Sequence, residues 1–485
     1  MSQDKHPSTA TGAIPLITPG ADALASTTIE NELGAKRVYT RPASQPGQQG
    51  KQEPSAKTKQ RIPTGLWVLI AASFMIALGY GLVAPVLPSY ARSFDVGVAA
   101  TTMVVSALAL TRLLFAPTSG QLISRYGERP IYTLGMLIVA ISSFINAIAW
   151  DYWVLLASRA FAGIGSVMFT VSAMGLLVRL SPAHMRGRIS GLYATAFMLG
   201  NILGPVLGGL LSPFGMRLPF VIYGVALIIA GAIVWFMMPS TAELERERDA
   251  MDGTEHAAAG TAETTEPKPV QESMTFKQAM TFGNYRSALV TSFANGWAIF
   301  GVQSSLIPLL AASLVLASDP NNIAGGTVLA STAMTAYALG NAITQSLSGS
   351  LSDKVGRRIL LFIGLLMAAA VTALMGVVHI IWVFITAAVF LGVGAAVMGP
   401  SLQAAVSDVI GTQRDGGRVL AIYQMSADLG LILGPLFAGL VADAFGFMPA
   451  FMLCSAVLLL ASLGWLPWVK PKFDPELAEE GYTGR

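Results

Sequence analysis

The residues of this sequence that could do chemistry are charged side chains inside apolar stretches. Asp428, in the stretch YQMSADLGLILGPLFAG, is the only acidic residue in the middle of such a stretch, because the other acids fall in tails, loops or stretch ends. Arg112 and Arg159 are the basic residues inside apolar stretches. An ionised side chain at the centre of a membrane costs at least about 2.5–3.5 kcal/mol on insertion scales, so each charge needs a partner or, for Asp428, a proton.

Arg112 and Asp428 are predicted to lie at the same depth. Counted from the inner ends of their helices at Ser124 and Gly417, they lie about 18 Å and about 16 Å deep at a rise of 1.5 Å per residue. A nearby cation favours the ionised carboxylate, and separation in a low dielectric favours its protonation. We therefore predict that this pair couples proton binding to a movement of two helices. The alternative is a permanent structural ion pair.

The elements that carry these charges are predicted to be membrane helices. Of the 485 residues, 53% are hydrophobic and 12% are charged, with a mean hydropathy of +0.61, whereas soluble proteins carry about 25% charged residues. Apolar runs of at least about 18 residues predict membrane spans. Twelve such runs occur, at 66–90, 98–123, 130–150, 153–178, 187–211, 217–238, 286–316, 325–350, 358–378, 380–406, 417–442 and 447–469. We predict an all-α polytopic membrane protein with twelve transmembrane helices.

The basic residues predict the orientation of the chain. With the N-terminus in the cytoplasm, all but four of the 30 lysines and arginines fall in tails and inner loops. The positive-inside rule then predicts a multi-pass protein of the cell membrane with both termini in the cytoplasm. Because these basic residues serve topology, they do not indicate a nucleic-acid partner.

The composition excludes several kinds of site. The single cysteine, Cys454, allows no internal disulfide, and the four histidines lack metal-ligand spacing. The sequence contains no Walker loop and no hydrolytic triad motif, and its GIG and GVG segments lie within membrane spans rather than after a strand. We therefore predict that the chain is not an enzyme and holds no metal and no cofactor.

The chain is predicted to consist of two related six-helix bundles. The expected segments are a disordered cytoplasmic tail at 1–63, a first bundle at 64–239, a cytoplasmic linker with a short interfacial helix at 240–284, a second bundle at 285–470 and a cytoplasmic tail at 471–485. GQLISRYGERP at 120–130 aligns with GSLSDKVGRRI at 349–359, an offset of 229. Two parallel repeats are typical of transporters that expose a central site alternately to either side.

The aligned segments form a loop motif in each half. Its members are Gly120, Arg125, Gly127, Glu128 and Arg129 in the first copy and Gly349, Asp353, Lys354, Gly356, Arg357 and Arg358 in the second. Glycines permit a tight turn, and cations anchor it at the cytoplasmic face. The twelve spans, the repeat and these loops resemble the major facilitator superfamily over residues 64–470. The resemblance implies that the loops lock the two halves in an outward-facing state, although Ser124 and Glu128 depart from the family pattern; alternatively the loops only set topology.

Two further motifs resemble those of the same family. Gly191, Gly200, Gly204, Pro205, Gly208 and Gly209, with a second copy at Gly430, Gly434 and Pro435, match a motif of the drug:proton antiporter branch. Glycines at every fourth position also allow helices to approach closely, so ordinary packing is the alternative. Arg159 begins the segment RAFAGIG, which resembles a family motif whose arginine is linked to proton transfer; here the alternative is a tie between two helices.

The resemblance implies secondary active transport. We predict a proton-coupled antiporter that exports small amphipathic or drug-like molecules, a multidrug-resistance type of efflux, by alternating access. The alternatives are a permease for one metabolite, by export or proton symport, and a non-transporting membrane sensor or assembly partner. The predicted partners are a small-molecule substrate, protons and the lipid bilayer, with the chain a monomer. Polar or aromatic residues expected at mid-span depth around a substrate cavity are Tyr80, Phe197, Trp297, Gln303, Tyr337, Asn341, Gln403 and Tyr423.

Overall fold

A computed structural model describes residues 64–181, 185–238, 274–319, 322–410 and 417–466. The predicted tails at 1–63 and 471–485 and most of the predicted linker therefore lie outside the described residues. Within the described ranges, every regular element is a helix.

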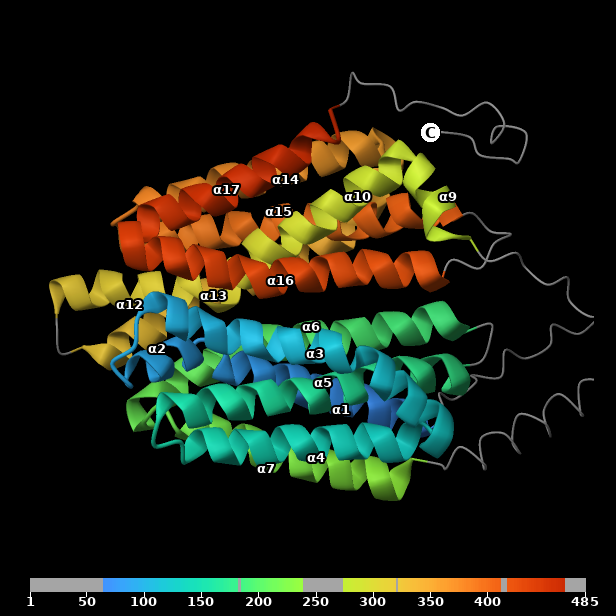
Figure 1. The fold of residues 1–485 in the computed structure, drawn as a ribbon, viewed down its shortest axis with the longest axis horizontal. Helices are drawn as coiled ribbons and strands as arrows, with labels where there is room; N and C mark the ends of the chain where they lie inside the picture. The colour runs from blue at the N-terminus through green and yellow to red at the C-terminus, as the bar shows by residue number, and fades with distance from the viewer. Residues whose placement is uncertain (1–63, 182–184, 239–273, 320–321, 411–416, 467–485) are drawn as a thin grey trace, which may run out of the picture. The chain divides into compact units, whose positions relative to one another are not determined.

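The first half of the chain forms a bundle of long helices (Figure 1). α1 packs against α6 and α7, α5 packs against α3 and α4, and α4 also packs against α7. Buried aliphatic and aromatic side chains between these helices form one hydrophobic core. The helices are α1 (Thr64–Val83), α2 (Leu87–Arg92), α3 (Val98–Tyr126), α4 (Glu128–Ala147), α5 (Tyr152–Leu180), α6 (Arg186–Leu211), the 3₁₀ turn η2 (Ser212–Phe214) and α7 (Leu218–Met237).

The second half repeats this arrangement around a core of its own. α13 packs against α12 and α15, α14 packs against α15 and α17, and α16 packs against α10, the π-helical turn η3 and α17. The helices are α9 (Phe276–Thr281), α10 (Gly283–Ala294), η3 (Asn295–Gly301), α11 (Val302–Ser304), α12 (Leu306–Ser318), α13 (Ile323–Val355), α14 (Arg357–Val377), α15 (Ile381–Ile410), α16 (Gly417–Phe445) and α17 (Phe447–Leu463).

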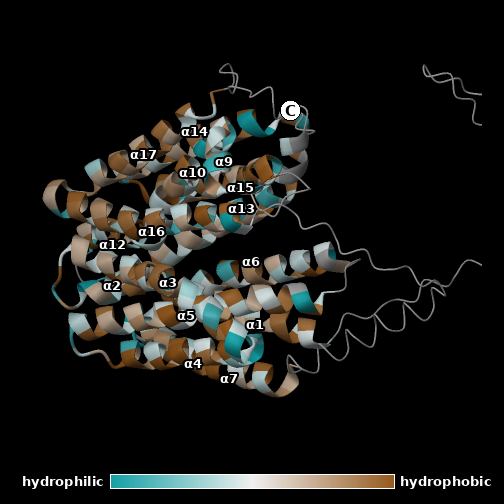
Figure 2. Cartoon of the chain, turned by 45° about the vertical axis from the view of Figure 1, so that its right-hand side comes forward, coloured by the Kyte–Doolittle hydropathy of each residue, from teal (hydrophilic) through white to brown (hydrophobic). Residues whose placement is uncertain are grey.

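The helices are apolar enough to cross a membrane. By length and composition, ten spans of the described chain meet this requirement, and the run from Gly283 to Ser318 combines α10, η3, α11 and α12. The remaining two predicted spans coincide with α13, of 33 residues, and with α17, a shorter apolar helix of 17 residues. Figure 2 shows hydrophobic residues along most of each helix. The predicted helical class is confirmed, and α9 lies where the short interfacial helix was expected.

Equivalent close contacts recur in the two halves. A Cβ atom added to Gly81 of α1 would lie 2.9 Å from Cδ of Pro205 on α6. A Cβ atom added to Gly301, at the end of η3, would lie 2.9 Å from Cδ of Pro435 on α16. The two contacts join corresponding residues of the repeat, so the same glycine–proline contact brings two helices together in each half.

The glycines of α6 allow its backbone to touch that of α1. A Cβ atom added to Gly200 would lie 2.7 Å from the backbone nitrogen of Leu78, and one added to Gly204 would lie 2.6 Å from the carbonyl oxygen of the same residue. A Cβ atom added to Gly208 would lie 2.6 Å from the carbonyl oxygen of Leu82. Since real side chains do not tolerate such distances to backbone atoms, this face of α6 requires glycine.

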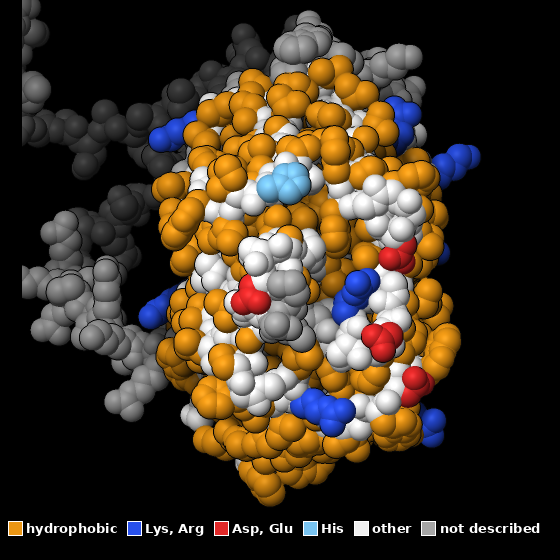
Figure 3. All heavy atoms as spheres, turned by 90° about the vertical axis from the view of Figure 1, so that its left-hand side faces the viewer, with side chains coloured by type: hydrophobic (Ala, Val, Ile, Leu, Met, Phe, Trp, Pro, Cys, Tyr) orange, Lys and Arg blue, Asp and Glu red, His pale blue; other side chains and the backbone are white. Residues whose placement is uncertain are grey.

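The two halves are joined at one end of the bundle. The side chain of Asp443, on α16, accepts hydrogen bonds from the backbone N–H groups of Val98 and Ala99 at the start of α3, both at 2.7 Å. Further along α3, the hydroxyl of Ser106 donates to the carbonyl of Ile432 at 2.7 Å. We call this the Asp443 end; Figure 3, which faces it, shows a few acidic and basic side chains on a mostly hydrophobic surface.

At the opposite end, the corresponding parts of the helices are not packed together. We call this the motif end, because the α3–α4 and α13–α14 turns lie there. Most side chains of α3 beyond Leu114 are exposed, and so are most of those in the first turns of α6 and α16. Ile343 and Leu347 of α13 are exposed by 67% and 62%. The hydrogen bonds between α3 and α16 all lie in the half of each helix nearest Asp443, so the described conformation is closed at the Asp443 end and open at the motif end.

Substitution at a close glycine should destabilise the protein. Gly204→Ala places a Cβ atom against backbone of α1, so we expect the free energy of unfolding to fall by about 1–3 kcal/mol. Gly191→Ala is the matched control, because no atom lies within 4 Å of the added Cβ. Its expected change is within about 0.5 kcal/mol. Denaturant unfolding of both purified variants measures the difference, and equal stabilities would contradict the contact.

Loss of the Asp443 carboxylate should loosen the closed end. Asp443→Asn removes the charge and leaves one acceptor oxygen for two N–H donors, so the N-terminus of α3 should separate more often. A cysteine at Thr102, which is fully buried beside Gly439, reports this opening once Cys454 is replaced by alanine. Labelling by a hydrophilic maleimide should become about fivefold faster for each kcal/mol lost. Asp95→Asn, an exposed acid near the same end, is the control, and equal labelling rates in the two variants would contradict the role of Asp443.

Candidate functional site

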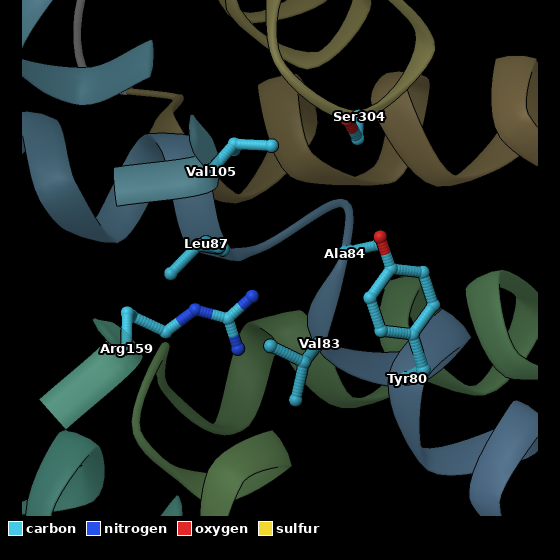
Figure 4. Close-up of a pocket in the computed structure, with 7 residues that line it drawn as sticks. All are labelled: Tyr80, Val83, Ala84, Leu87, Val105, Arg159 and Ser304. Atoms are coloured by element: carbon cyan, nitrogen blue, oxygen red, sulfur yellow. The ribbon is translucent and has the colours of Figure 1, made fainter. Parts of the chain in front are cut away.

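A pocket lies where helices of the first half meet a residue of the second. It is a small pocket, partly open to its surroundings, and is lined by Tyr80, Val83, Ala84, Leu87, Val105, Arg159 and Ser304 (Figure 4). Tyr80 and Val83 belong to α1, Leu87 to α2, Val105 to α3, Arg159 to α5 and Ser304 to α11, while Ala84 lies just after α1. The walls are mainly aliphatic, with two hydroxyl groups and one cation as the polar groups.

Arg159 is the charged group of this pocket. Its side chain is only 7% exposed, and its Nε atom has no hydrogen-bond partner among the described residues. Tyr80 and Tyr223 are titratable side chains close to it. In Figure 4 the guanidinium points toward Val83 and Leu87. The buried cation therefore lacks an acidic partner in the described part of the chain.

Local sequence explains why α5 brings Arg159 to this position. Asp151 caps the start of α5 by accepting a hydrogen bond from the backbone N–H of Trp153 at 3.2 Å. One turn after Arg159, Gly163 touches the backbone of Leu108 on α3. A larger residue than glycine would push α5 away from α3 and out of the pocket wall.

Arg112 and Asp428 lie near each other across the contact of α3 with α16. Both side chains are half-buried, and Arg112 is the cation that acts electrostatically on the Asp428 carboxylate. Gln424, one turn earlier on α16, lies within hydrogen-bonding reach of the same carboxylate. The described residues contain no direct Arg112–Asp428 ion pair within 4.0 Å. The pair lies just beyond the Ser106–Ile432 hydrogen bond, at the boundary between the closed and open parts of this contact.

The first loop motif makes its contacts within its own half. Gly127 ends α3 with a φ of +84°, a conformation that favours glycine. Glu128 is buried and pairs with Arg179 of α5 at 2.8 Å. The guanidinium of Arg129 lies 5.2 Å from the ring centroid of Trp235 on α7 and donates to its carbonyl. Glu128 thus supplies a carboxylate, but to an arginine of the same half; Gly120 and Arg125 are exposed.

The second loop motif behaves in the same way. Gly356 ends α13 with a φ of +95°. Arg357 forms an ion pair with Asp408 of α15 and donates to the carbonyl of Ala404 at 3.0 Å. Arg358 donates to the carbonyl of Leu466 at 3.1 Å. Lys354 is exposed, and the structure does not describe the surroundings of Gly349 or the side chain of Asp353. The lock between halves, expected for an outward-facing state, stays a prediction.

The remaining glycines of the antiporter motif have different surroundings. A Cβ atom on Gly209 would lie 2.8 Å from Cβ of Ser331, on α13 of the other half. A Cβ atom added to Gly430 would clash with the backbone of Phe293, and one added to Gly434 would lie 2.5 Å from the carbonyl oxygen of Trp297. The second copy of the motif therefore packs α16 onto α10 and η3.

The predicted cavity residues separate into four groups. Tyr80 lines the pocket, and Phe197 and Gln403 are exposed at the surface. Gln303, Asn341 and Tyr423 are half-buried. Trp297 and Tyr337 are buried in the second core, where Trp297 stacks on Phe437 with ring centroids 5.6 Å apart.

Sequence reasoning missed Ser304 and Tyr223. Ser304 follows the π-helical turn η3, which ends at Gly301. A π-helical turn takes up more residues than an α-helical turn and rotates the residues that follow. Because of this rotation, Ser304 lines the pocket, whereas the sequence predicts its neighbour Gln303 there. Tyr223 carried no signal, because a tyrosine within an apolar helix does not reveal which charge it faces.

Known proteins resemble this chain in sequence. Quinolone resistance protein NorA of Staphylococcus aureus is 32% identical over 165 residues, which is 34% of this chain and 42% of NorA. The match therefore spans less than half the length of NorA. Multidrug resistance protein 2 of Bacillus subtilis is 23% identical over 408 residues, 84% of this chain and 96% of that protein.

Solved transporter structures share the fold. A bacterial homolog of the human lysosomal transporter Spinster, in an inward-facing and occupied conformation, superposes with a TM-score of 0.61 at 16% identity and covers 82% of this chain and 95% of its own. The nucleoside transporter NupG gives a TM-score of 0.61 at 13% identity over 84% and 100% of the two chains. At these identities the likeness concerns the fold alone.

The family model described as Major Facilitator Superfamily matches residues 69–330 and 322–482. This match confirms the predicted family, its two-bundle helical fold and the expectation that the chain is not an enzyme. With the apolar helices, it also identifies a multi-pass membrane protein. The chain belongs to the major facilitator superfamily.

Proposed function

We propose that the protein is a secondary transporter that exports small amphipathic or drug-like molecules in exchange for protons. The resemblance to NorA and to Multidrug resistance protein 2 supports export of such molecules. The glycine and proline motif of α6 supports the antiporter branch. We infer that the protein works in the cell membrane, as a monomer, with both termini in the cytoplasm, so that the motif end faces the cytoplasm.

One observation carries the proposal for proton coupling. Asp428, the only acid in the middle of a span, lies beside Arg112 at the boundary between the closed and open parts of the α3–α16 contact. Alternating access requires this contact to change, because one end must open as the other closes. A rocking movement therefore alters the Arg112–Asp428 distance directly.

The distance between the two groups would link conformation to proton binding. A shorter distance to the guanidinium favours the ionised carboxylate and so releases a proton, whereas a longer distance favours the protonated form. Exchange for an exported substrate requires the carboxylate to release its proton while the motif end is open to the cytoplasm and to bind one while the opposite end is open. Substrate and proton then favour opposite steps of the cycle, as exchange requires.

Removal of the titratable group should abolish coupling. Asp428→Asn keeps the size of the side chain but binds no exchangeable proton, so we expect ethidium export driven by a pH gradient in everted vesicles to fall to background. Asp428→Glu, which can still titrate, should retain measurable export.

Asp95→Asn is the matched control, because it removes an exposed acid outside the membrane helices, and it should export ethidium like the unaltered protein. Undiminished gradient-driven export by Asp428→Asn would exclude the coupling role. Accumulation of substrate with the proton gradient, instead of export against it, would favour the symporter alternative.

A further inference from the structure

We propose that Arg159 binds an anionic group of the transported molecule, so that the substrates include small amphipathic carboxylates or sulfonates. This inference rests on the proposed transport function and specifies one class of its substrates. It starts from the pocket that Arg159, Tyr80 and Ser304 share.

The charge of Arg159 calls for a counter-ion. Because Arg159 is only 7% exposed, its cation loses most of its hydration, which is unfavourable unless a partner replaces the water. The described acids form their ion pairs elsewhere, Glu128 with Arg179 and Asp408 with Arg357. A carboxylate or sulfonate on a ligand would supply the missing charge and accept two parallel N–H bonds.

A purely structural role does not fit the surroundings of Arg159. An arginine that ties two helices together should have its N–H groups bonded to backbone carbonyls, yet its Nε lacks any partner in the described structure. The repeat provides a second argument. The residue 229 positions later is Ala388, which is fully buried in α15. The equivalent helix of the other half therefore packs without a charge at this position.

The rest of the pocket indicates an amphipathic ligand. Val83, Leu87 and Val105 provide an aliphatic wall beside the guanidinium (Figure 4). Tyr80 and Ser304 add hydroxyl groups that can orient a polar substituent. In its chemistry, this combination of a cation, hydroxyl groups and an aliphatic wall matches a ligand with an apolar body and one acidic group, whereas an inorganic anion would leave the aliphatic wall without contacts.

The position of the pocket connects binding to transport. Ser304 belongs to the second half, while Arg159 and the aliphatic wall belong to the first. A ligand that touches both sides contributes binding energy only while the two halves are close at this point. Such a ligand therefore favours one conformation of the transporter over the other.

A matched pair of probes tests the proposal on the purified, full-length protein. Naphthalene-2-carboxylate and 2-naphthamide share one aromatic body and differ in charge. By titration calorimetry without a proton gradient, the carboxylate should bind about 10- to 100-fold more tightly than the amide, because hydrogen bonds to a buried charge are strong. Equal affinity of the two probes for the unaltered protein would overturn the proposal whether or not any variant folds.

Substitutions then test whether Arg159 causes the preference for the carboxylate probe. Arg159→Gln should lose the preference for the carboxylate while its weak binding of the amide is unchanged, and Arg159→Lys should retain part of the preference. Arg92→Gln, which removes an exposed arginine outside the pocket, is the control and should bind both probes normally. A carboxylate preference that survives in a folded Arg159→Gln variant would also overturn the proposal.

The binding assay tests the anion site and the vesicle assay tests the proposed transport function, so either proposal can be contradicted without the other. Arg159-dependent binding without gradient-driven export would support the anion site and contradict the proposed function. Ethidium export without preferential carboxylate binding would support the function and overturn the anion site.

Discussion

The Asp443 carboxylate, by holding the first free N–H groups of α3, joins the two halves of this protein at one end. A helix N-terminus carries unsatisfied donors and a partial positive charge, so an acid from another helix is a strong partner for it. Here the acid comes from a residue 345 positions away, and the bond therefore closes one end of the bundle. Both candidate sites depend on that closure, because the Arg112–Asp428 pair and the Arg159 pocket lie between the halves.

Within each half, close helix contacts leave little room for internal movement. Gly204 against Leu78 and Gly434 against Trp297 bring backbones so close that sliding would create clashes. The ion pairs of the loop motifs also lie within single halves, since Glu128 and Arg357 both pair with residues of their own half. A conformational change that preserves these contacts must move one half against the other, which is the movement that alternating access requires.

Much of this arrangement could be predicted from the sequence because its signals are local. Apolar runs predicted the helices, and the rise per residue predicted a common depth for Arg112 and Asp428. The rest depends on the approach of distant segments. No local pattern reveals that Asp443 caps α3, or that η3 brings Ser304 rather than Gln303 to the pocket. Aromatic character at mid-depth likewise failed to separate Tyr80, which lines the pocket, from Tyr337, which is buried in the core.

Comparison of the two repeats shows at which charged positions the fold also accepts an uncharged residue. The counterpart of Arg112 is Asn341, which donates to the carbonyl of Gly392 at 3.4 Å and so bonds α13 to its neighbour α15. Arg159 corresponds to the buried Ala388, and Asp428 corresponds to the apolar Met198. Each charged position is therefore compatible with an uncharged residue in an equivalent helix of the same fold. Because a charge in the membrane interior destabilises the fold unless it is compensated, we propose that Asp428 and Arg112 are present for proton binding and Arg159 for an anionic ligand.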